Sequence, residues 1–209
     1  MDEPKQERAV QTRAAILRAA AEVFDEFGYT GASISKIMER AQVTQGGMYF
    51  HFKSKLGLAH AVLAHQQDFV HFPPQGVPGL QLLIDLNFFL ARELQTNVLF
   101  RASVRLAVEQ GDFGLRDDTA YQEWVDQFHD LLCAARERGE LLPYVDEREF
   151  ANVLVGAYSG VQVFSNIASG RADLQERLAS MWRYLLPGLA TPQTIAELRI
   201  PRDVREAAA

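Results

Sequence analysis

The sequence has few of the features that mark secreted or membrane-spanning proteins. Its 209 residues include one cysteine, Cys133, so no disulfide can form within the chain, and this indicates a reducing compartment. No apolar run approaches the roughly 20 residues that a membrane-spanning helix needs. The first residues, MDEPKQERAVQTR, are polar and lack the apolar core of a signal peptide. These absences predict a soluble, cytoplasmic protein.

The motifs of common enzyme classes are also missing. Ser159 stands in GAYSG, whose spacing is G-x-x-S-G and not the G-x-S-x-G of a nucleophile elbow. The DFG at residues 112–114 lacks the other kinase elements, and no Walker loop or dinucleotide fingerprint occurs. The five histidines have no spacing that suits a metal on one helix face. We therefore expect no catalytic site, no metal and no cofactor. Turnover of a small molecule by the purified protein would support the alternative that it is an enzyme.

Alternating apolar and polar runs, which are typical of strands, are absent as well, and no internal repeat occurs. Apolar residues instead recur with a helical period, and Ser33, Thr44 and Ser54 can each cap a helix. The pattern predicts an all-α fold with helices at residues 7–27, 33–41, a short one after residue 44, 55–72, 80–96, 98–110, 119–138, 147–169, 174–186 and 194–198.

The breaker-rich stretch PPQGVPG at residues 73–79 is the predicted domain boundary. We expect a domain at residues 1–54, a connecting helix at 55–72, a larger helical domain at 73–200 and a tail at 201–209. The net charge is −6, yet residues 33–60 carry four basic side chains against one acidic side chain. This local positive charge on an acidic chain favours nucleic-acid binding by the first domain.

Residues 44–52, TQGGMYFHF, lie within this positive segment. Two internal glycines cost a helix roughly 1 kcal/mol each, so the stretch needs a reason other than stability. In a helix-turn-helix motif the second helix enters the major groove, and Gly46 and Gly47 would let its backbone approach DNA. Gln45 can pair with adenine. The competing interpretation is a loop followed by core aromatics, and we expect Met48, Phe50 and Phe52 to pack.

The stretch TRAAILRAAAEVFDEFGYTGASISKIMERAQVTQGGMYFHFKSKLGLAHAV resembles the DNA-binding domain of TetR-family transcriptional regulators. The resemblance covers about residues 8–62 and includes the Ser33-capped helix and the V-T-x-G-x-x-Y-x-H-F-x-S-K signature. YFHF and QERAVQTR are most similar to the γ-butyrolactone receptors of streptomycete-type bacteria. The resemblance implies an all-helical homodimer with an N-terminal three-helix DNA-binding domain, a pseudopalindromic operator and a small-molecule pocket in a larger C-terminal ligand-binding and dimerisation domain.

The family pattern also implies roles for single residues. The positions that match its DNA-contacting signature are Thr44, Gly46, Tyr49, His51 and Lys55. All of them except Gly46 are expected to contact phosphate. Gln45 replaces the usual Lys and Gly47 the usual Ala, which leaves the operator preference open. AYQEWVDQF resembles the receptor helix whose tryptophan stacks on the butyrolactone ring, and that tryptophan corresponds to Trp124.

An apolar pocket with a few polar groups is expected around that tryptophan. The other predicted lining residues are Gln81, Phe88, Phe128, Val161, Gln162 and Phe164. For Phe88, Phe89 and Phe128, the competing interpretation is that their side chains only pack in the helical core. Val161 stands where related receptors can carry a ligand-binding threonine, which leaves the ligand open.

The predicted function is a ligand-responsive transcriptional repressor, released from DNA when a small signalling molecule such as a γ-butyrolactone binds. Helices 147–169 and 174–186 are the expected dimer surface, because Gly156, Ala157, Ser159 and Gly160 permit close helix approach. The helix at 55–72 is expected to carry the ligand signal to the DNA-binding domain. The alternative is a relative that senses an antibiotic, butenolide, furan or pathway intermediate, or a ligand-blind pseudo-receptor.

Overall fold

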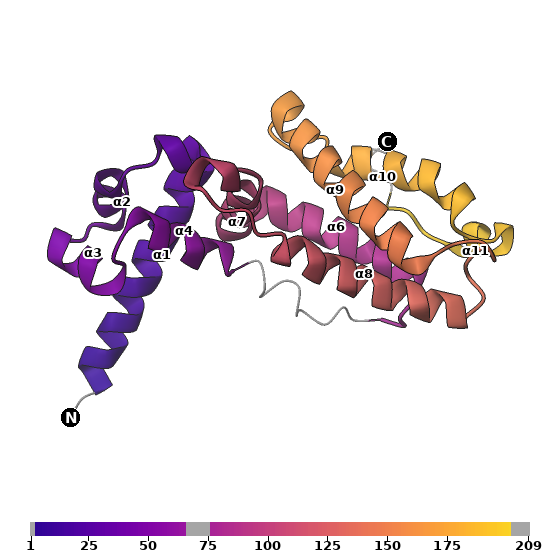
Figure 1. Cartoon of the computed structure of the whole chain (residues 1–209), viewed down its shortest axis with the longest axis horizontal. Helices are drawn as coiled ribbons and strands as arrows, with labels where there is room; N and C mark the ends of the chain where they lie inside the picture. Colours follow the sequence, from indigo (N-terminus) through magenta and orange to yellow (C-terminus); the bar gives the residue numbers. More distant parts are fainter. Residues whose placement is uncertain (1–2, 66–75, 202–209) are drawn as a thin grey trace, which may run out of the picture. The chain divides into compact units, whose positions relative to one another are not determined.

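The computed structural model describes residues 3–65 and 76–201, and these are almost entirely helical (Figure 1). The elements are α1 (Glu3–Gly31), α2 (Ile34–Ala41), α3 (Gln45–His51), α4 (Lys55–Leu63), α6 (Leu80–Thr96), α7 (Val98–Val108), the 3-10 helix η1 (Gln110–Phe113), α8 (Thr119–Glu137), α9 (Glu147–Ser169), α10 (Leu174–Leu185), the 3-10 helix η2 (Leu186–Gly188) and α11 (Pro192–Glu197). The predicted all-α fold is confirmed. None of the described helices is both long and apolar enough to cross a membrane.

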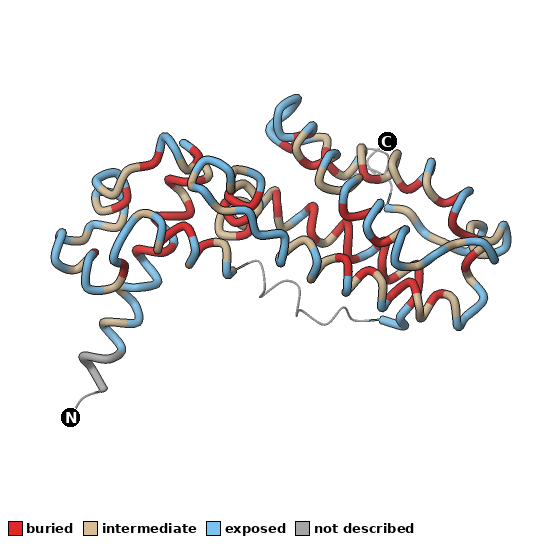
Figure 2. Tube along the Cα trace, in the orientation of Figure 1, coloured by how far each residue is buried: buried red, intermediate tan, exposed pale blue. Residues whose placement is uncertain are grey.

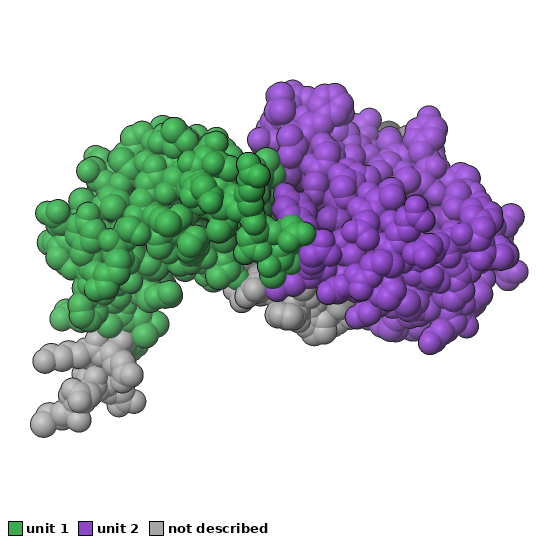
Figure 3. Space-filling model, in the orientation of Figure 1, with its two compact units in different colours: residues 1–71, 96–120 green, residues 72–95, 121–209 purple. Residues whose placement is uncertain are grey.

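The chain divides into two compact units (Figure 3). The first contains residues 1–71 and 96–120, and we call its described part the head; the second contains residues 72–95 and 121–209. In the head, α1 packs against α2, α4 and α7. Its most deeply buried side chains include Ile16, Phe24, Ile37, Met48, Leu58 and Leu106. Because Leu106 lies on α7, a helix distant in sequence completes the core of the N-terminal helices.

A polar network, which we call the α1–α7 network, joins the end of α1 to α7. Arg105 donates hydrogen bonds to the Glu109 carboxylate (2.7 Å) and to the carbonyl oxygen of Asp25 (2.5 Å). Glu109 also accepts a bond from the backbone N–H of Tyr29 (2.8 Å). Gly28 has a φ of +66°, and a Cβ atom there would lie 2.8 Å from both the Arg105 and Glu109 side chains. The kink in α1 therefore needs glycine for its backbone angle and for the close approach of α7.

The second unit is built on α6, α8, α9 and α10, with α6 and α9 running in one direction and α8 and α10 in the other (Figure 1). Buried residues lie along all four of these helices (Figure 2). The Gln95 side chain donates to the carbonyl oxygen of Arg171 (2.7 Å) and accepts from the Gln175 amide (3.2 Å). These two bonds place the end of α6 beside the start of α10.

Most predicted helix limits agree with the structure to within a few residues. The exception is α1, which begins at Glu3 and continues past the Gly28 kink to Gly31. The predicted helix at 55–72 is longer than α4, which ends at Leu63 with Ala64 as its C-cap, and residues 66–75 lie outside the described residues. Residues 96–120, expected in the second domain, pack in the first unit. There α7 packs against α1 and α4.

Candidate functional site

The short helix α3 has well-formed ends. The Thr44 hydroxyl accepts a hydrogen bond from the backbone N–H of Gly47 (3.2 Å), and Ser33 does the same for Lys36 at the start of α2 (3.2 Å). Between the two helices, Gln42 adopts the left-handed conformation with a φ of 53°, which makes the turn tight. The predicted caps and the helix-turn-helix geometry are thus present. They hold α3 in place although its glycines make it a poor helix by propensity.

Burial of Met48 determines which face of α3 is exposed. Met48 is fully buried and Phe52 is 5% exposed, as the sequence predicts. Because successive helical residues are 100° apart, Gly46 and Phe50 lie on the side opposite Met48. Phe50 is 73% exposed and Tyr49 is 39% exposed. The prediction that Phe50 packs in the core is therefore wrong, and its two-residue spacing from Met48 is the signal that would have found this.

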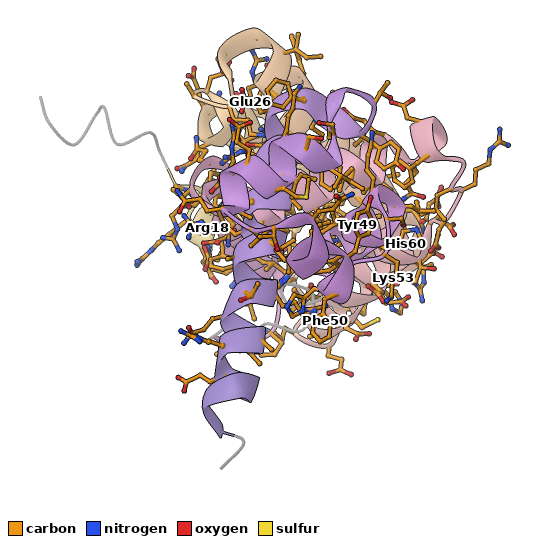
Figure 4. All side chains as sticks on the ribbon, turned by 90° about the vertical axis from the view of Figure 1, so that its left-hand side faces the viewer. Arg18, Glu26, Tyr49, Phe50, Lys53 and His60 are labelled. Atoms are coloured by element: carbon orange, nitrogen blue, oxygen red, sulfur yellow. The ribbon has the colours of Figure 1, made fainter. Side chains whose placement is uncertain are left out.

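The exposed residues on and just after α3 form what we call the α3 surface: Gln45, Gly46, Tyr49, Phe50 and Lys53. Figure 4 labels three of them, Tyr49, Phe50 and Lys53. Beside this surface, the half-buried ring of His51 meets the ring of Phe50 edge-on, with 4.9 Å between centroids. Amide, phenol and ammonium groups supply donors for bases and phosphates. Neither Phe50 nor Lys53 belongs to the set of contacts predicted from the sequence.

Lys55 is directed toward the interior of the head. Its Nζ donates to the carbonyl oxygen of Ala32 (2.8 Å) and lies 4.3 Å from the centroid of the Tyr29 ring. Desolvation lowers the pKa of Lys55. Tyr29 in turn packs on Phe113 of η1, with 4.4 Å between ring centroids. Lys55 thus helps to join α4, α1 and η1, and its expected phosphate contact, which remains a prediction, would use its other two N–H groups.

The predicted ligand-binding residues occupy three different environments. Gln81 exchanges two hydrogen bonds with the backbone of Arg199 (2.8 and 3.0 Å) and so attaches the C-terminal segment to α6. Val161 and Phe164 line a surface groove between α9 and α10, where Phe164 is 59% exposed. The other four lie in the bundle interior or at its edge: Phe88, Trp124, Phe128 and Gln162. The rings of Trp124 and Phe128 are in contact, with 6.0 Å between centroids.

Several polar atoms in the interior of the second unit have no hydrogen-bond partner among the described residues. They are the Asn87 amide, the Tyr158 hydroxyl, the Gln162 Oε1 and the Trp182 Nε1, which we call the unpaired polar set. Asn87 and Trp182 are fully buried, and Gln162 is 3% exposed. Burial raises the pKa of Tyr158, so its hydroxyl keeps its proton at neutral pH. Sequence reasoning found only Gln162, because polar burial cannot be read from a residue type alone.

Three members of the unpaired polar set lie at a similar height in the bundle. The Gln95–Gln175 hydrogen bond marks one end of it. At 1.5 Å per helical residue, Asn87 and Trp182 are both about 10–12 Å from that bond, along α6 and α10 respectively. Gln162 lies seven residues before the end of α9, a similar distance from the same end. Three helices of the second unit therefore each bury an unpaired polar group at a comparable distance from the same end of the bundle.

Exposed apolar side chains on the outside of α9 and α10 form what we call the apolar strip, although Arg177 covers part of the Phe164 ring. Its large members are Val153 (51% exposed), Phe164 (59%), Ile167 (78%) and, on α10, Tyr184 (84%). Gly156 and Gly160 lie between them on α9, and nothing in the structure is within 4 Å of a Cβ placed on either. An exposed surface of this kind, with room for a second backbone, is typical of a helix-helix interface.

The described residues contain no group of three or more side chains able to hold a metal ion. Cys133 lies 3.5 Å from the Nε2 of His129. Desolvation and the carboxylate of Glu147 raise the pKa of the Cys133 thiol. A protonated thiol is a poor nucleophile.

Comparison with known proteins agrees with these features. The family description "Bacterial regulatory proteins, tetR family" matches residues 16–62, and "Tetracyclin repressor-like, C-terminal domain" matches residues 77–191. The chain is 43% identical to the A-factor receptor protein of Streptomyces griseus over 195 residues, which cover 93% of this chain and 70% of that protein.

Solved structures are similar over nearly the whole chain. TylP, a TetR regulator from Streptomyces fradiae, is 43% identical with a TM-score of 0.75, and the alignment covers 98% of this chain and 90% of TylP. A γ-butyrolactone receptor described as ArpA-like is 30% identical with a TM-score of 0.71, covering 91% and 93%. The resemblance inferred from the sequence is confirmed, and the chain belongs to the TetR family of DNA-binding bacterial regulatory proteins.

Proposed function

We propose that this chain is a repressor that binds a pseudopalindromic operator as a homodimer and leaves it when a small molecule, such as a γ-butyrolactone, binds to the second unit. The observation that carries the proposal is the orientation of α3: burial of Met48 turns Gly46 and Phe50 outward, and Gln45 is exposed at the first position of the helix. In helix-turn-helix proteins the second helix lies in the major groove.

The residues that match the family signature, and their neighbours Ser33, Gln45 and Gly47, have proposed roles. Gln45 contacts a base, and the side chains of Thr44, Tyr49, His51 and Lys55 contact phosphate oxygens. Gly46 and Gly47 allow the backbone to approach the groove, and Ser33 caps the helix before them. Such a protein acts where its operator is, in the cytoplasm. DNA chemistry thus accounts for the two glycines that a purely structural helix would not contain.

The apolar strip on α9 and α10 supports the homodimer. Phe164 and Ile167 expose large apolar side chains, and Gly156 and Gly160 leave space for a partner helix. A C2 interface presents the same patch from both subunits, so one self-complementary strip is enough. Two heads held in this way can bind two half-sites at once, which a pseudopalindromic operator requires.

The unpaired polar set supports a ligand site inside the second unit. A buried polar atom without a partner costs about 1–3 kcal/mol, and a bound molecule that supplies the partner recovers that energy. The Trp182 and Asn87 N–H groups suit a carbonyl oxygen, and the Gln162 Oε1 suits a hydroxyl. A γ-butyrolactone has a ring carbonyl, and similarity to an A-factor receptor and a γ-butyrolactone receptor favours that class.

Release from DNA follows if the ligand binds more tightly to a conformation in which the two heads do not match the half-sites. A coupling of about 1–3 kcal/mol changes operator affinity about 5–150-fold. The chain crosses between the two units three times, after residues 71, 95 and 120, and the second of these crossings leads from α6 into α7. The α1–α7 network makes the second connection a physical route to α1.

A second candidate is a TetR-family regulator that senses another small molecule, such as an antibiotic, a butenolide, a furan or a pathway intermediate, or none. Gln45 favours it, because γ-butyrolactone receptors usually have Lys at that position. Val161, which stands where related receptors can carry a ligand-binding threonine, is weaker support for this candidate, because its side chain lines the outer groove and not the interior.

The test is a fluorescence anisotropy titration of the purified protein against DNA from upstream of its own gene, with and without a panel of γ-butyrolactones. The proposal expects tight, salt-sensitive binding that one lactone abolishes. Tight binding that no lactone changes would favour the second candidate. Absence of specific DNA binding would contradict both.

A further inference from the structure

Phe50 is a large apolar side chain that the head leaves in solvent. Its side chain is 73% exposed, and its ring meets the ring of His51 edge-on. It lies about 200° around α3 from the fully buried Met48, so it points away from the head core. Phe50 contributes little to the packing of the fold, and its position needs another explanation.

Gly46 extends the surface that Phe50 provides. Helical side chains lean toward the N-terminus and lie over the preceding turn, so the Phe50 ring leans toward Gly46. Nothing lies within 4 Å of a Cβ placed on Gly46. The phenyl ring is therefore open on the face of α3 that carries Gly46; Gln45, the residue assigned to a base, lies about 140° around the helix from Phe50. A larger residue than glycine at position 46 would cover part of this ring.

Positive charges near this ring would attract the phosphate backbone of DNA. Lys53 is exposed three residues after Phe50, and residues 33–60 are the most positive segment of an acidic chain. A phenyl ring cannot form a hydrogen bond with a phosphate or with a base edge. In the major groove the one apolar group that distinguishes the bases is the C5 methyl of thymine.

We propose that Phe50 contacts a thymine methyl group in each half-site, and that it selects thymine at that position. The inference rests on the proposed operator binding and adds a specificity-determining residue to it. Gly46 has the role of keeping the ring accessible. The rest of the base reading, through Gln45, is independent of this contact.

The test removes the methyl group from DNA without changing its hydrogen bonds. The full-length protein first selects its binding sequence from a random double-stranded library. Each thymine of the selected site is then replaced by uracil, and affinity is measured by anisotropy for the wild type, Phe50→Leu and Phe50→Ala. Because Phe50 is exposed, we expect all three proteins to unfold at the same temperature, and this is measured in parallel.

Burial of one methyl group corresponds to about a fourfold change in affinity. Replacement of one thymine of each half-site by uracil should lower the affinity of the wild type about fourfold. The same replacement should lower the affinity of Phe50→Leu about twofold and leave that of Phe50→Ala unchanged. The proposal is overturned if no thymine is methyl-sensitive, or if Phe50→Ala keeps the full sensitivity. It is also overturned if Phe50→Ala weakens binding equally on all sequences, since the ring would then pack on the sugar-phosphate backbone. Failure to enrich any sequence would contradict operator binding itself.

Discussion

The two units differ in whether their buried polar side-chain atoms have hydrogen-bond partners. Among the described side chains of the head, at residues 7–65 and 96–120, no buried polar atom lacks a hydrogen-bond partner. The α1–α7 network illustrates this, because Glu109 and Arg105 satisfy both side-chain and backbone groups around Gly28. In the second unit, Asn87, Gln162 and Trp182 each bury a polar atom without a partner.

This difference separates a surface that must be rigid from an interior that can bind a ligand. In the proposed function the head presents the α3 surface to DNA, and complete pairing of its buried polar groups favours a single conformation of that surface. The second unit retains unpaired donors and acceptors at a cost in stability, as functional sites commonly do. The comparison predicts that two kinds of substitution differ in their effect on stability: removal of a paired polar group of the head should destabilise the fold, whereas removal of an unpaired polar group of the second unit should not.

The largest expected effect comes from a residue of the second unit that is remote in sequence from α3. Ile167→Glu places a charge on the apolar strip of α9, where Ile167 is 78% exposed. We expect a monomer, because two carboxylates would face each other in a symmetric interface, and operator affinity should fall about 100-fold when the heads are no longer linked. Mass in solution and anisotropy measure the two effects. Tyr144→Glu, at a residue 73% exposed in the loop before α9, is the control; a monomeric wild type would contradict the dimer.

The head should respond strongly to loss of one side chain of the α1–α7 network. Glu109→Leu leaves the Tyr29 N–H and the Arg105 guanidinium without their partner. We expect a loss of about 1–3 kcal/mol, and a fall in Tm of about 2–4 °C for each kcal/mol. Glu39→Leu, at an exposed position of α2, should change stability by less than about 0.5 kcal/mol. Equal effects of the two substitutions would mean that the network does not stabilise the head.

The matching substitution in the second unit is Asn87→Leu. It replaces a fully buried, unpaired amide with an apolar side chain of similar size. We expect a stability that is unchanged or higher by about 1 kcal/mol, with unchanged operator affinity and no response to ligand. Thermal unfolding and the anisotropy titration with lactones measure these quantities. Asn152→Leu, on the exposed side of α9, is the control. A large loss of stability in Asn87→Leu would mean that the amide is paired and that the contrast between the units is wrong.

The sequence predicts local features of both units well, because these depend on neighbours along the chain. Ser33 and Thr44 are caps in the structure as the sequence indicates, and α9 spans Glu147–Ser169 as its apolar period predicts. Capping and helix period involve contacts within about four residues. Long-range packing is different: nothing local indicates that Leu106 of α7 completes the core of α1–α4.

The candidate sites follow the same division. Thr44, Gln45 and Tyr49 belong to one short motif, so the sequence alone predicts that Thr44 caps α3 and that the other two lie on it. Phe50 was assigned to the core because aromatic residues are usually buried, and its exposure depends on how Met48 is held by the other helices. Asn87 and Trp182 were missed for a related reason: only the tertiary structure reveals that they are buried without a partner.

The smallest expected effect concerns the turn between α9 and α10, where a carboxylate of the second unit is fully paired. Hydrogen bonds from Ser165 and Ser169, with Arg177 nearby, lower the pKa of Asp173 from its ordinary 3.8 to about 2. A lowered pKa stabilises the fold above about pH 4, and this contribution disappears as the pH falls from 4 through 2. Asp173→Asn should therefore unfold at a lower temperature than the wild type at pH 6, with the difference shrinking below pH 4. A Tm difference that stays constant from pH 6 to pH 2 would mean that the charge of Asp173 does not stabilise the turn, and that the second unit gains nothing from its paired groups here.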